Sequence, residues 1–358
     1  MTGQRGWIES LSPWPEEFGL GRIRALLAEL GQPQRDYPAI HVVGTNGKST
    51  ATRRAAAFLG REGLRVGAYT SPHVSGWSER IQVAGEDADF DAAVERIRPV
   101  ADRVGATQFE ALTAAALAEF AATAVDVAVI EAGLGGSLDA TNVLGAEIVV
   151  LTNVSLDHTD VLGETREQIA REKLAVVARD ATVVLGEREW MPAARERGAG
   201  RLILAEDVGR AAAEAFLGRS LGGDVDVHLP GRFDRVGDDV YAGAHNPAGV
   251  EWLAARLPRD DYVVCAAILA DRDAEAMLAR LSRVGSRFVA TQTESERSCP
   301  AEDLAKLARE FFPAVESVAN ASRALDRAHE LAGPNGAVLV TGSLYLLRDL
   351  TRRLENVR

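Results

Sequence analysis

The chain is poor in cysteine and has no long apolar run. Two cysteines, Cys265 and Cys299, are too few to form a metal cluster by themselves, and so small a number suits a reducing compartment. No apolar run approaches the ~18–20 residues that cross a bilayer, and the N-terminal segment lacks a secretory apolar region. Lys and Arg number 40 against 52 Asp and Glu, and no basic cluster offsets the net charge of −12. We therefore expect a cytoplasmic protein with neither a membrane nor a nucleic-acid partner.

Lysine is scarce enough to be informative. The chain has only three, Lys48, Lys173 and Lys306, among its 40 basic residues. Arginine cannot replace lysine where a compact amine that can lose its proton is required. A lysine beside a chemically demanding motif is therefore a candidate for function.

What the sequence does contain is an alternation of short apolar runs and helical stretches over 358 residues, of which 47% are hydrophobic. This alternation predicts βαβ units and a parallel sheet, and the length suits two domains. A first series of predicted elements comprises strands at 39–43, 65–69, 126–130 and 148–151 and helices at 48–61, 90–104, 109–121 and 165–177. A second series comprises strands at 262–267, 287–290 and 337–341 and helices at 274–284 and 300–311. Residues 218–237, rich in Gly and Asp, predict a linker, and we place the domain boundary near Leu229.

A glycine-rich loop follows the first predicted strand and opens the first long predicted helix. It consists of Gly44, Thr45, Asn46, Gly47, Lys48, Ser49 and Thr50. Glycines let backbone N–H groups approach phosphates, a helix N-terminus adds positive potential, and a lysine reaches the outer phosphates. The hydroxyl of Ser49 or Thr50 suits Mg²⁺. Valine occupies position 42, where the general GxxxxGK[ST] pattern has glycine, yet the placement of the loop favours phosphate binding over an ordinary turn.

Polar side chains follow two other predicted strands. Glu131 comes directly after the strand at 126–130, and Asp157 and His158 follow the strand at 148–151. The carboxyl ends of parallel strands are where α/β proteins bind ligands, and a carboxylate there can hold Mg²⁺. Taken alone, Glu131 could be solvated in a loop and His158 could be structural. Lys173, in a predicted helix, could equally form a surface pair with a neighbouring Glu.

Several longer motifs occur in order along residues 18–173. They are Phe18-Gly19-Leu20-Gly21-Arg22-Ile23, residues 41–48, Thr70-Ser71-Pro72-His73, Glu79-Arg80-Ile81, and residues 107–113, 131–142, 156–163 and 169–173. Shorter motifs in the second domain are Pro230-Gly231-Arg232, Ala244-His245-Asn246-Pro247, Asp271-Arg272-Asp273 and Thr341-Gly342-Ser343. Together they resemble the folylpolyglutamate synthase/dihydrofolate synthase family, within the wider Mur-type amide ligases.

The resemblance implies an α/β fold of two domains. Residues 1–228 would form a P-loop, Mur-ligase-like ATP-binding domain with a parallel sheet, and residues 229–358 a smaller, Rossmann-like glutamate-ligase domain. The implied activity is ATP-dependent addition of L-glutamate to dihydropteroate and/or tetrahydrofolate through an acyl phosphate. The expected partners are therefore small molecules, namely pteroate or folate, L-glutamate and ATP, and we expect a monomer.

The resemblance also assigns roles to individual residues. The ligands of two Mg²⁺ ions would be Ser71, Glu131, His158 and a Lys173 carboxylated by CO₂. ATP would be bound by the loop at 44–50 together with Arg232 and Asn246. Catalytic roles would fall to Lys48, Lys173 and His245, and substrate contacts to Pro72, His73, Asp157, Asp160 and Ser343. For Asp160, a helix N-cap is an alternative role.

Three departures from the family pattern leave other functions open. Ser49 stands where these folate enzymes usually have glycine, which favours a Mur-like ligase acting on another carboxylate. Ala242 occupies the usual Asp position, and the stretch at 174–231 is shorter than is typical. The last two departures favour a nucleotide-binding member of the family with reduced catalysis.

Overall fold

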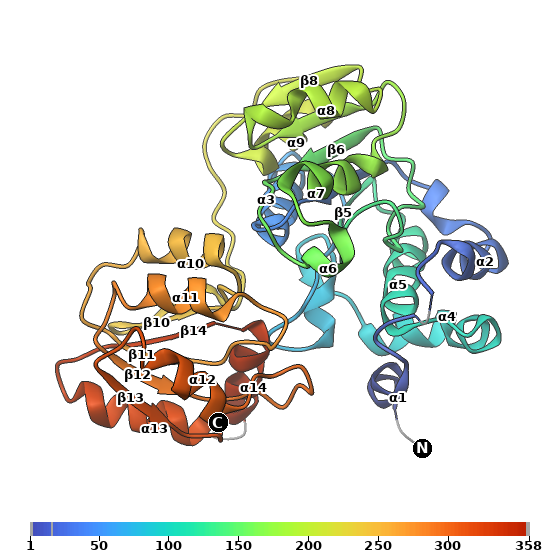
Figure 1. The fold of residues 1–358 in the computed structure, drawn as a ribbon. Helices are drawn as coiled ribbons and strands as arrows, with labels where there is room; N and C mark the ends of the chain where they lie inside the picture. The colour runs from blue at the N-terminus through green and yellow to red at the C-terminus, as the bar shows by residue number, and fades with distance from the viewer. Residues whose placement is uncertain (1–2, 16, 356–358) are drawn as a thin grey trace. The chain divides into compact units, whose positions relative to one another are not determined.

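The computed structural model describes residues 3–15 and 17–355, which form two compact units (Figure 1). Unit 1 takes in the described residues up to Pro72 and then Trp77–His228, and unit 2 takes in His73–Gly76 and the described residues from Leu229 onward. The main division falls at the residue where the sequence predicted a boundary, whereas the grouping of His73–Gly76 with unit 2 was not predicted.

Unit 1 is built on an eight-stranded sheet in the order β4-β3-β2-β5-β1-β6-β7-β8. Its strands are β1 (Ala39–Val43), β2 (Val66–Tyr69), β3 (Ile81–Val83), β4 (Glu86–Asp87), β5 (Val127–Glu131), β6 (Ile148–Leu151), β7 (Thr182–Leu185) and β8 (Arg201–Leu204). All neighbours pair in parallel except β2 with β3 and β3 with β4. The carboxyl ends of β2, β5, β1 and β6 therefore lie side by side at one edge of the sheet.

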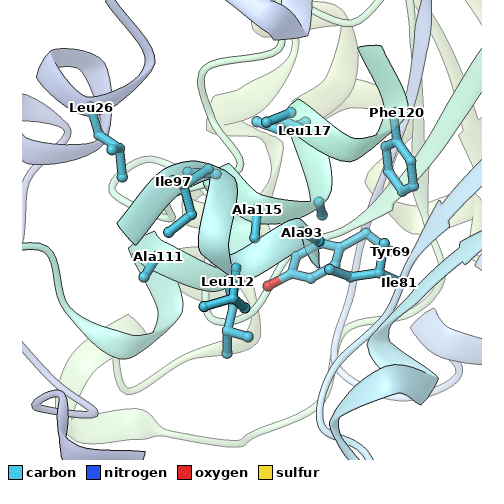
Figure 2. Packing of buried hydrophobic residues seen from close by; sticks show 14 of the residues in the cluster. Leu26, Tyr69, Ile81, Ala93, Ile97, Ala111, Leu112, Ala115, Leu117 and Phe120 are labelled. Carbon is cyan, nitrogen blue, oxygen red and sulfur yellow. The ribbon is translucent and has the colours of Figure 1, made fainter. Parts of the chain in front are cut away.

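The helices of unit 1 are α1 (Gln4–Ser10), α2 (Gly21–Glu29), α3 (Lys48–Arg61), α4 (Phe90–Val104), α5 (Gln108–Ala122), α6 (Thr159–Leu162), α7 (Arg166–Lys173), α8 (Met191–Glu196) and α9 (Val208–Leu217). α5 begins with a capping box in which Thr107 and Glu110 each bond the other's backbone N–H. It is apolar on nearly all sides, as expected of a helix buried in a core. Figure 2 shows α5 side chains packed against residues of α2, α4, β2 and β3, including Leu26, Ile97, Tyr69 and Ile81.

Unit 2 contains a six-stranded sheet in the order β13-β12-β11-β14-β10-β9, in which only β9 is antiparallel to its neighbour. Its strands are β9 (Arg232–Val236), β10 (Asp239–Ala242), β11 (Val263–Ala266), β12 (Arg287–Ala290), β13 (Ala314–Ser317) and β14 (Val338–Thr341). Its helices are α10 (Pro247–Ala254), α11 (Ala274–Leu281), α12 (Ala301–Ala308), α13 (Ala321–Ala332) and α14 (Leu344–Glu355). The predicted fold class, two α/β units with largely parallel sheets, is confirmed.

Two sequence predictions about single elements are wrong. The helix predicted at 165–177 ends at Lys173 and continues as a 3₁₀ turn over Leu174–Val176, and the β-branched Val176 and Val177 disfavour the α-helix there. The linker predicted at 218–237 contains strand β9. Because β9 is an edge strand of a sheet, it tolerates the charged residues that made it resemble a linker.

No helix among residues 3–15 and 17–355 is long and apolar enough to cross a membrane. Both cysteines are free thiols, and Cys265 is fully buried in β11.

Candidate functional site

The glycine-rich loop between β1 and α3 is held by the segment that follows β6. The Thr45 N–H donates to the Asn153 carbonyl oxygen at 2.9 Å, and the Asn46 N–H donates to Asn153 Oδ1 at 3.0 Å. The Thr152 hydroxyl and the Asn153 side-chain amide both donate to the Asn46 carbonyl oxygen, at 2.7 and 3.1 Å. Thr152 and Asn153 were missed as site residues, although their position directly after the strand beside β1 was a usable signal.

The loop also needs glycine for a steric reason. Gly44 has a φ of +149°, and a Cβ atom built on it would lie 1.8 Å from Thr152 Oγ1. α3 then begins at Lys48, whose Nζ donates to the Thr45 carbonyl oxygen at 3.2 Å. A helix N-terminus and a lysine amine therefore meet at one loop, which is the arrangement that binds phosphate groups.

Glu131, the last residue of β5, lies against both the loop helix and the segment after β2. The Ser49 hydroxyl donates to Glu131 Oε1 at 3.1 Å, and the Ser71 N–H donates to Oε2 at 3.0 Å. The carboxylate is only 2% exposed. A carboxylate and a serine hydroxyl in contact are hard oxygen donors of the kind that Mg²⁺ prefers, so this part of the site fits a divalent cation.

Lys173, the last residue of α7, is buried and not part of a surface ion pair. Its exposed fraction is 4%, and burial, helped by the nearby positive charge of Lys48, lowers its pKa to about 7. Asp139 and Glu172 oppose that shift. The neighbouring Glu172 instead accepts hydrogen bonds from the N–H and hydroxyl of Ser137, at 2.9 and 2.7 Å. The alternative interpretation of Lys173 as a surface residue is therefore wrong.

Backbone atoms fix the position of Lys173. A Cβ atom built on Gly136 would lie 2.5 Å from the Glu172 carbonyl oxygen and 2.7 Å from that of Lys173. Only a glycine allows the loop after β5 to pack so closely on the end of α7. The glycine-rich loop after Glu131 and the lysine are thus positioned together.

A buried polar network supports the same loop. The Thr141 hydroxyl donates to Asp139 Oδ1, and its oxygen accepts from His41 Nε2 at 2.7 Å. Asp139 Oδ2 also accepts from the Leu134 N–H at 2.7 Å. Burial lowers the pKa of His41 to about 3, so the ring is neutral, and burial raises the pKa of Asp139. His41 is therefore a structural residue.

Replacing Thr141 with valine is expected to destabilise the protein by about 2 kcal/mol, because it leaves the buried His41 Nε2 without its hydrogen-bond partner and removes one of the hydrogen bonds that Asp139 accepts. Urea denaturation of Thr141→Val measures the change in the free energy of unfolding. Thr52 is the matched control, since its fully buried hydroxyl has no hydrogen-bond partner among the described atoms. Thr52→Val should stay within about 0.5 kcal/mol of the wild type. Equal losses of unfolding free energy in the two variants would show that the hydrogen-bond network adds nothing to stability.

The segment after β6 carries three further candidates. His158 adopts a left-handed conformation with φ of 50° at the N-cap position of α6, and its Nε2 lies 3.9 Å from Asp157 Oδ1. Asp160 is exposed and is the second residue of α6, so the N-cap alternative for Asp160 is wrong. Across the described part of the chain, no group of three or more His, Cys, Asp or Glu side chains is placed to hold a metal. Of the four predicted metal ligands, Ser71 and Glu131 contact each other. His158 lies beside Asp157, and Lys173 is within electrostatic range of Lys48, Asp139 and Glu172.

Two of the remaining candidates lie directly after Ser71, where Pro72 is exposed and His73 is buried. The others follow residue 229. His245 Nδ1 lies 2.9 Å from the Gly243 carbonyl oxygen, and Asn246 caps α10 by accepting the Gly249 N–H at 2.8 Å.

Arg232 and Ser343 lie at strand ends of unit 2. Arg232 begins β9 and pairs with Ala242 of β10. The hydroxyls of Ser343 and Thr341, at the carboxyl end of β14, are buried without a hydrogen-bond partner in the described structure. Two such hydroxyls suit a polar ligand.

Two family models match the chain. The Mur ligase middle domain matches residues 42–201, and the Mur ligase glutamate ligase domain matches residues 231–344. The matches cover the glycine-rich loop and Glu131 in unit 1 and most of unit 2.

Curated relatives carry folate-related names. The chain is 32% identical to the dihydrofolate synthase/folylpolyglutamate synthase of Mycobacterium tuberculosis, over 89% of this chain and 84% of the relative. It is 31% identical to the protein of the same name from Escherichia coli, over 98% of this chain and 94% of the relative. A probable bifunctional folylpolyglutamate synthase/dihydropteroate synthase of Haloferax volcanii is 33% identical over 92% of this chain, which spans only 48% of that relative.

Solved structures of similar proteins match the fold of this chain over nearly its whole length. A folylpolyglutamate synthase of M. tuberculosis complexed with ADP has a TM-score of 0.88 at 30% identity, covering 98% of this chain and 97% of that one. E. coli FolC in complex with DHPP and ADP has a TM-score of 0.87 at 28% identity, with 100% and 99% covered. A bifunctional folylpolyglutamate synthase/dihydrofolate synthase with Mn, AMPPNP and L-glutamate bound has a TM-score of 0.86 at 27% identity, with 99% and 98% covered. The chain belongs to the dihydrofolate synthase/folylpolyglutamate synthase family of ATP-dependent amino-acid ligases.

Proposed function

We propose that the protein adds L-glutamate to dihydropteroate and/or tetrahydrofolate, using ATP and an acyl-phosphate intermediate. The single observation that carries the proposal is the Glu131 carboxylate, which contacts Ser49 of the loop helix on one side and Ser71 on the other. This contact puts a carboxylate that suits a divalent cation beside a loop that suits phosphate groups. The substrates named with the similar structures, DHPP and L-glutamate, support the folate assignment.

The loop Gly44–Thr50 would bind ATP, and Arg232 and Asn246 are further candidate nucleotide contacts. Lys48 would neutralise charge on the outer phosphates. Glu131 and Ser71 would bind Mg²⁺, with Ser49 as a neighbouring oxygen donor. When bound, the divalent ion neutralises negative charge that gathers on the transferred phosphoryl group.

Lys173 would be carboxylated and would serve, with His158, as a ligand of a second Mg²⁺. Its burial next to Lys48 favours the uncharged amine, which is the form that reacts with CO₂. The amine nitrogen bonds to the carbon of CO₂ and loses a proton, so the product is a carbamate anion that the positive charge of Lys48 attracts. Asp139 and Glu172 face the same amine.

The reaction would proceed in two balanced steps. A substrate carboxylate oxygen attacks the γ-phosphorus of ATP, and the bond to the β-γ bridging oxygen breaks to release ADP. The uncharged amine of glutamate then attacks the acyl carbon, phosphate leaves, and the nitrogen loses a proton. His245 is the candidate residue of unit 2 for the phosphorylated intermediate. Pro72, His73, Asp157, Asp160 and Ser343 are the candidate substrate contacts. Excluding water protects an acyl phosphate from hydrolysis.

Product mass tests the proposal directly. The protein is incubated with ATP, Mg²⁺ and L-glutamate, and with 7,8-dihydropteroate or tetrahydrofolate in separate reactions. The expected result is a product heavier than the acceptor by one glutamyl residue, with one ADP released per product. Omitting glutamate or the acceptor should abolish that product.

The other outcomes separate the alternatives. Addition of glutamate or another amino acid to a peptidoglycan-precursor carboxylate, with no folate product, would establish a Mur-like ligase, as Ser49 suggests. Nucleotide binding without ADP release under any acceptor would establish a family member with lost catalysis, as Ala242 suggests. Either result would overturn the folate assignment.

The proposed enzyme is a cytoplasmic monomer. Two free cysteines suit the reducing cytoplasm. Sedimentation at micromolar concentration should give the mass of one chain, 38.2 kDa.

A further inference from the structure

α3 carries a buried charged side chain one helical turn beyond Ser49. Arg53 follows Ser49 by four residues, so the two lie on one face of the helix, and Arg53 is only 6% exposed. Its Nη2 donates to Thr70 Oγ1 at 3.0 Å and to the Glu79 carbonyl oxygen. Nε and Nη1 are buried and have no hydrogen-bond partner among the described atoms.

The two groups that Arg53 contacts form the base of one loop. Thr70 directly follows β2 and Glu79 precedes β3, and the Thr70 N–H donates to the Arg80 carbonyl oxygen at 2.9 Å. The residue after Thr70 is Ser71, whose N–H contacts Glu131 Oε2. The guanidinium therefore acts one residue away from the contact that orients the carboxylate.

Stability alone does not account for this side chain. Burying a guanidinium is costly, and an apolar residue of similar volume often serves stability as well or better. Here two of its three nitrogens lack hydrogen-bond partners, so part of that cost is not recovered. Arg53 makes two specific contributions. Its Nη2 donates hydrogen bonds to Thr70 and Glu79, and its positive charge interacts favourably with Glu79, Asp87 and Glu131.

We propose that Arg53 is a positioning residue for the cation site. By joining Thr70 to Glu79 it fixes the base of the loop at 70–80, and so holds the Ser71 N–H and the Glu131 carboxylate in the arrangement that receives a divalent cation. The proposal rests on the metal site of the proposed function, but the hold on the loop is a property of this chain without any ligand.

Amide hydrogen exchange of the ligand-free protein tests the hold on the loop. In Arg53→Met, peptides covering residues 70–80 should exchange about tenfold faster or more than in the wild type, because the donor to both ends of the loop is lost. Thr70→Val, which keeps the charge and removes one acceptor, should show a smaller increase. Arg53→Lys should lie between wild type and Arg53→Met, since it keeps the charge but not the planar fork.

Binding of Mn²⁺, followed by electron paramagnetic resonance with a non-hydrolysable ATP analogue, tests the consequence. The dissociation constant for Mn²⁺ should rise about 10–100-fold in Arg53→Met, as for other groups that orient metal ligands. Nucleotide affinity without the cation should stay unchanged, whereas a general loss of structure would weaken both.

Arg54 provides the matched control on the same helix. It forms ion pairs with Asp207 and Asp224, both at 2.6 Å, which belong to neither the loop at 70–80 nor the cation site. Arg54→Met should alter neither exchange at 70–80 nor Mn²⁺ affinity.

The results separate the two levels of the proposal. Unchanged exchange at 70–80 in Arg53→Lys and Thr70→Val, or an equal change in Arg54→Met, overturns the role of Arg53, whether or not Arg53→Met folds. Faster exchange in Arg53→Met with an unchanged dissociation constant for Mn²⁺ overturns the link between Arg53 and the cation site. If the wild type binds no Mn²⁺, the metal part of the proposed function fails, and the exchange data alone decide whether Arg53 holds the loop.

Discussion

Replacing Lys48 with methionine should lower the ligase turnover number by about 10²–10³-fold, the loss seen when one preorganised charge donor is removed from a reacting group. Lys48 begins α3, and its amine lies over the loop at 3.2 Å from the Thr45 carbonyl oxygen. It is therefore placed to neutralise charge on the outer phosphates. Methionine keeps most of the volume of the side chain and removes only the charge. Product formation under saturating ATP and acceptor measures the effect.

Arginine at the same position distinguishes charge from geometry. Lys48→Arg restores the positive charge with a larger, planar group that does not fit a site made for a compact amine. We expect it to recover less than a tenth of the turnover lost in Lys48→Met, in line with the scale of such effects. Full turnover in Lys48→Met, with unaltered folding, would refute the assignment of the loop as a phosphate site.

Replacing Lys173 with alanine should lower turnover by about 10²-fold or more, because the proposed carbamate is lost along with its share of cation binding. Short carboxylic acids such as acetate or propionate should restore part of the activity by entering the space left by the side chain. Lys173→Arg should resist this rescue, since its guanidinium fills the space and stays charged. Absence of rescue together with full activity of Lys173→Arg would exclude carboxylation.

The pH dependence of the same residue gives an independent test. With a pKa of about 7, the uncharged amine rises from about a tenth at pH 6 to about nine tenths at pH 8. The carbamate formed from labelled bicarbonate in the metal-free protein, seen by carbon NMR, should increase over that range. The unfolded chain keeps a proton that the folded chain has lost, so stability from this group should also rise with pH above about 7. Lys173→Met should remove both dependences.

The fold could be predicted well where burial and sequence pattern coincide. Strands β1, β6 and β12 and helices α3 and α4 have the predicted bounds, because buried parallel strands are continuous apolar runs and the helices between them are amphipathic. β9 was missed because edge strands carry charges that resemble a linker. The early end of α7 depends on a 3₁₀ turn that propensity alone does not reveal.

The site could be predicted only where its chemistry is local in sequence. The loop with Lys48 and the strand-end Glu131 stand in short runs whose residue types match their proposed roles. The burial of Lys173 could not be predicted, because Arg171-Glu172-Lys173 has the composition of an exposed helix surface. Asn153 and Arg53 act through contacts more than 15 residues away in sequence, and nothing in their immediate neighbours signals those partners.

Main-chain packing at Gly136 has a practical consequence for enzyme engineering. The end of α7 rests on backbone atoms, so the position of residue 173 does not depend on which side chain stands there. A set of uncharged substitutions at position 173, none larger than lysine, should therefore keep the main chain in place and differ mainly in the group offered to the cation. The activities of these variants can be compared as a chemical series. By contrast, even alanine at position 136 would displace the backbone at the end of α7.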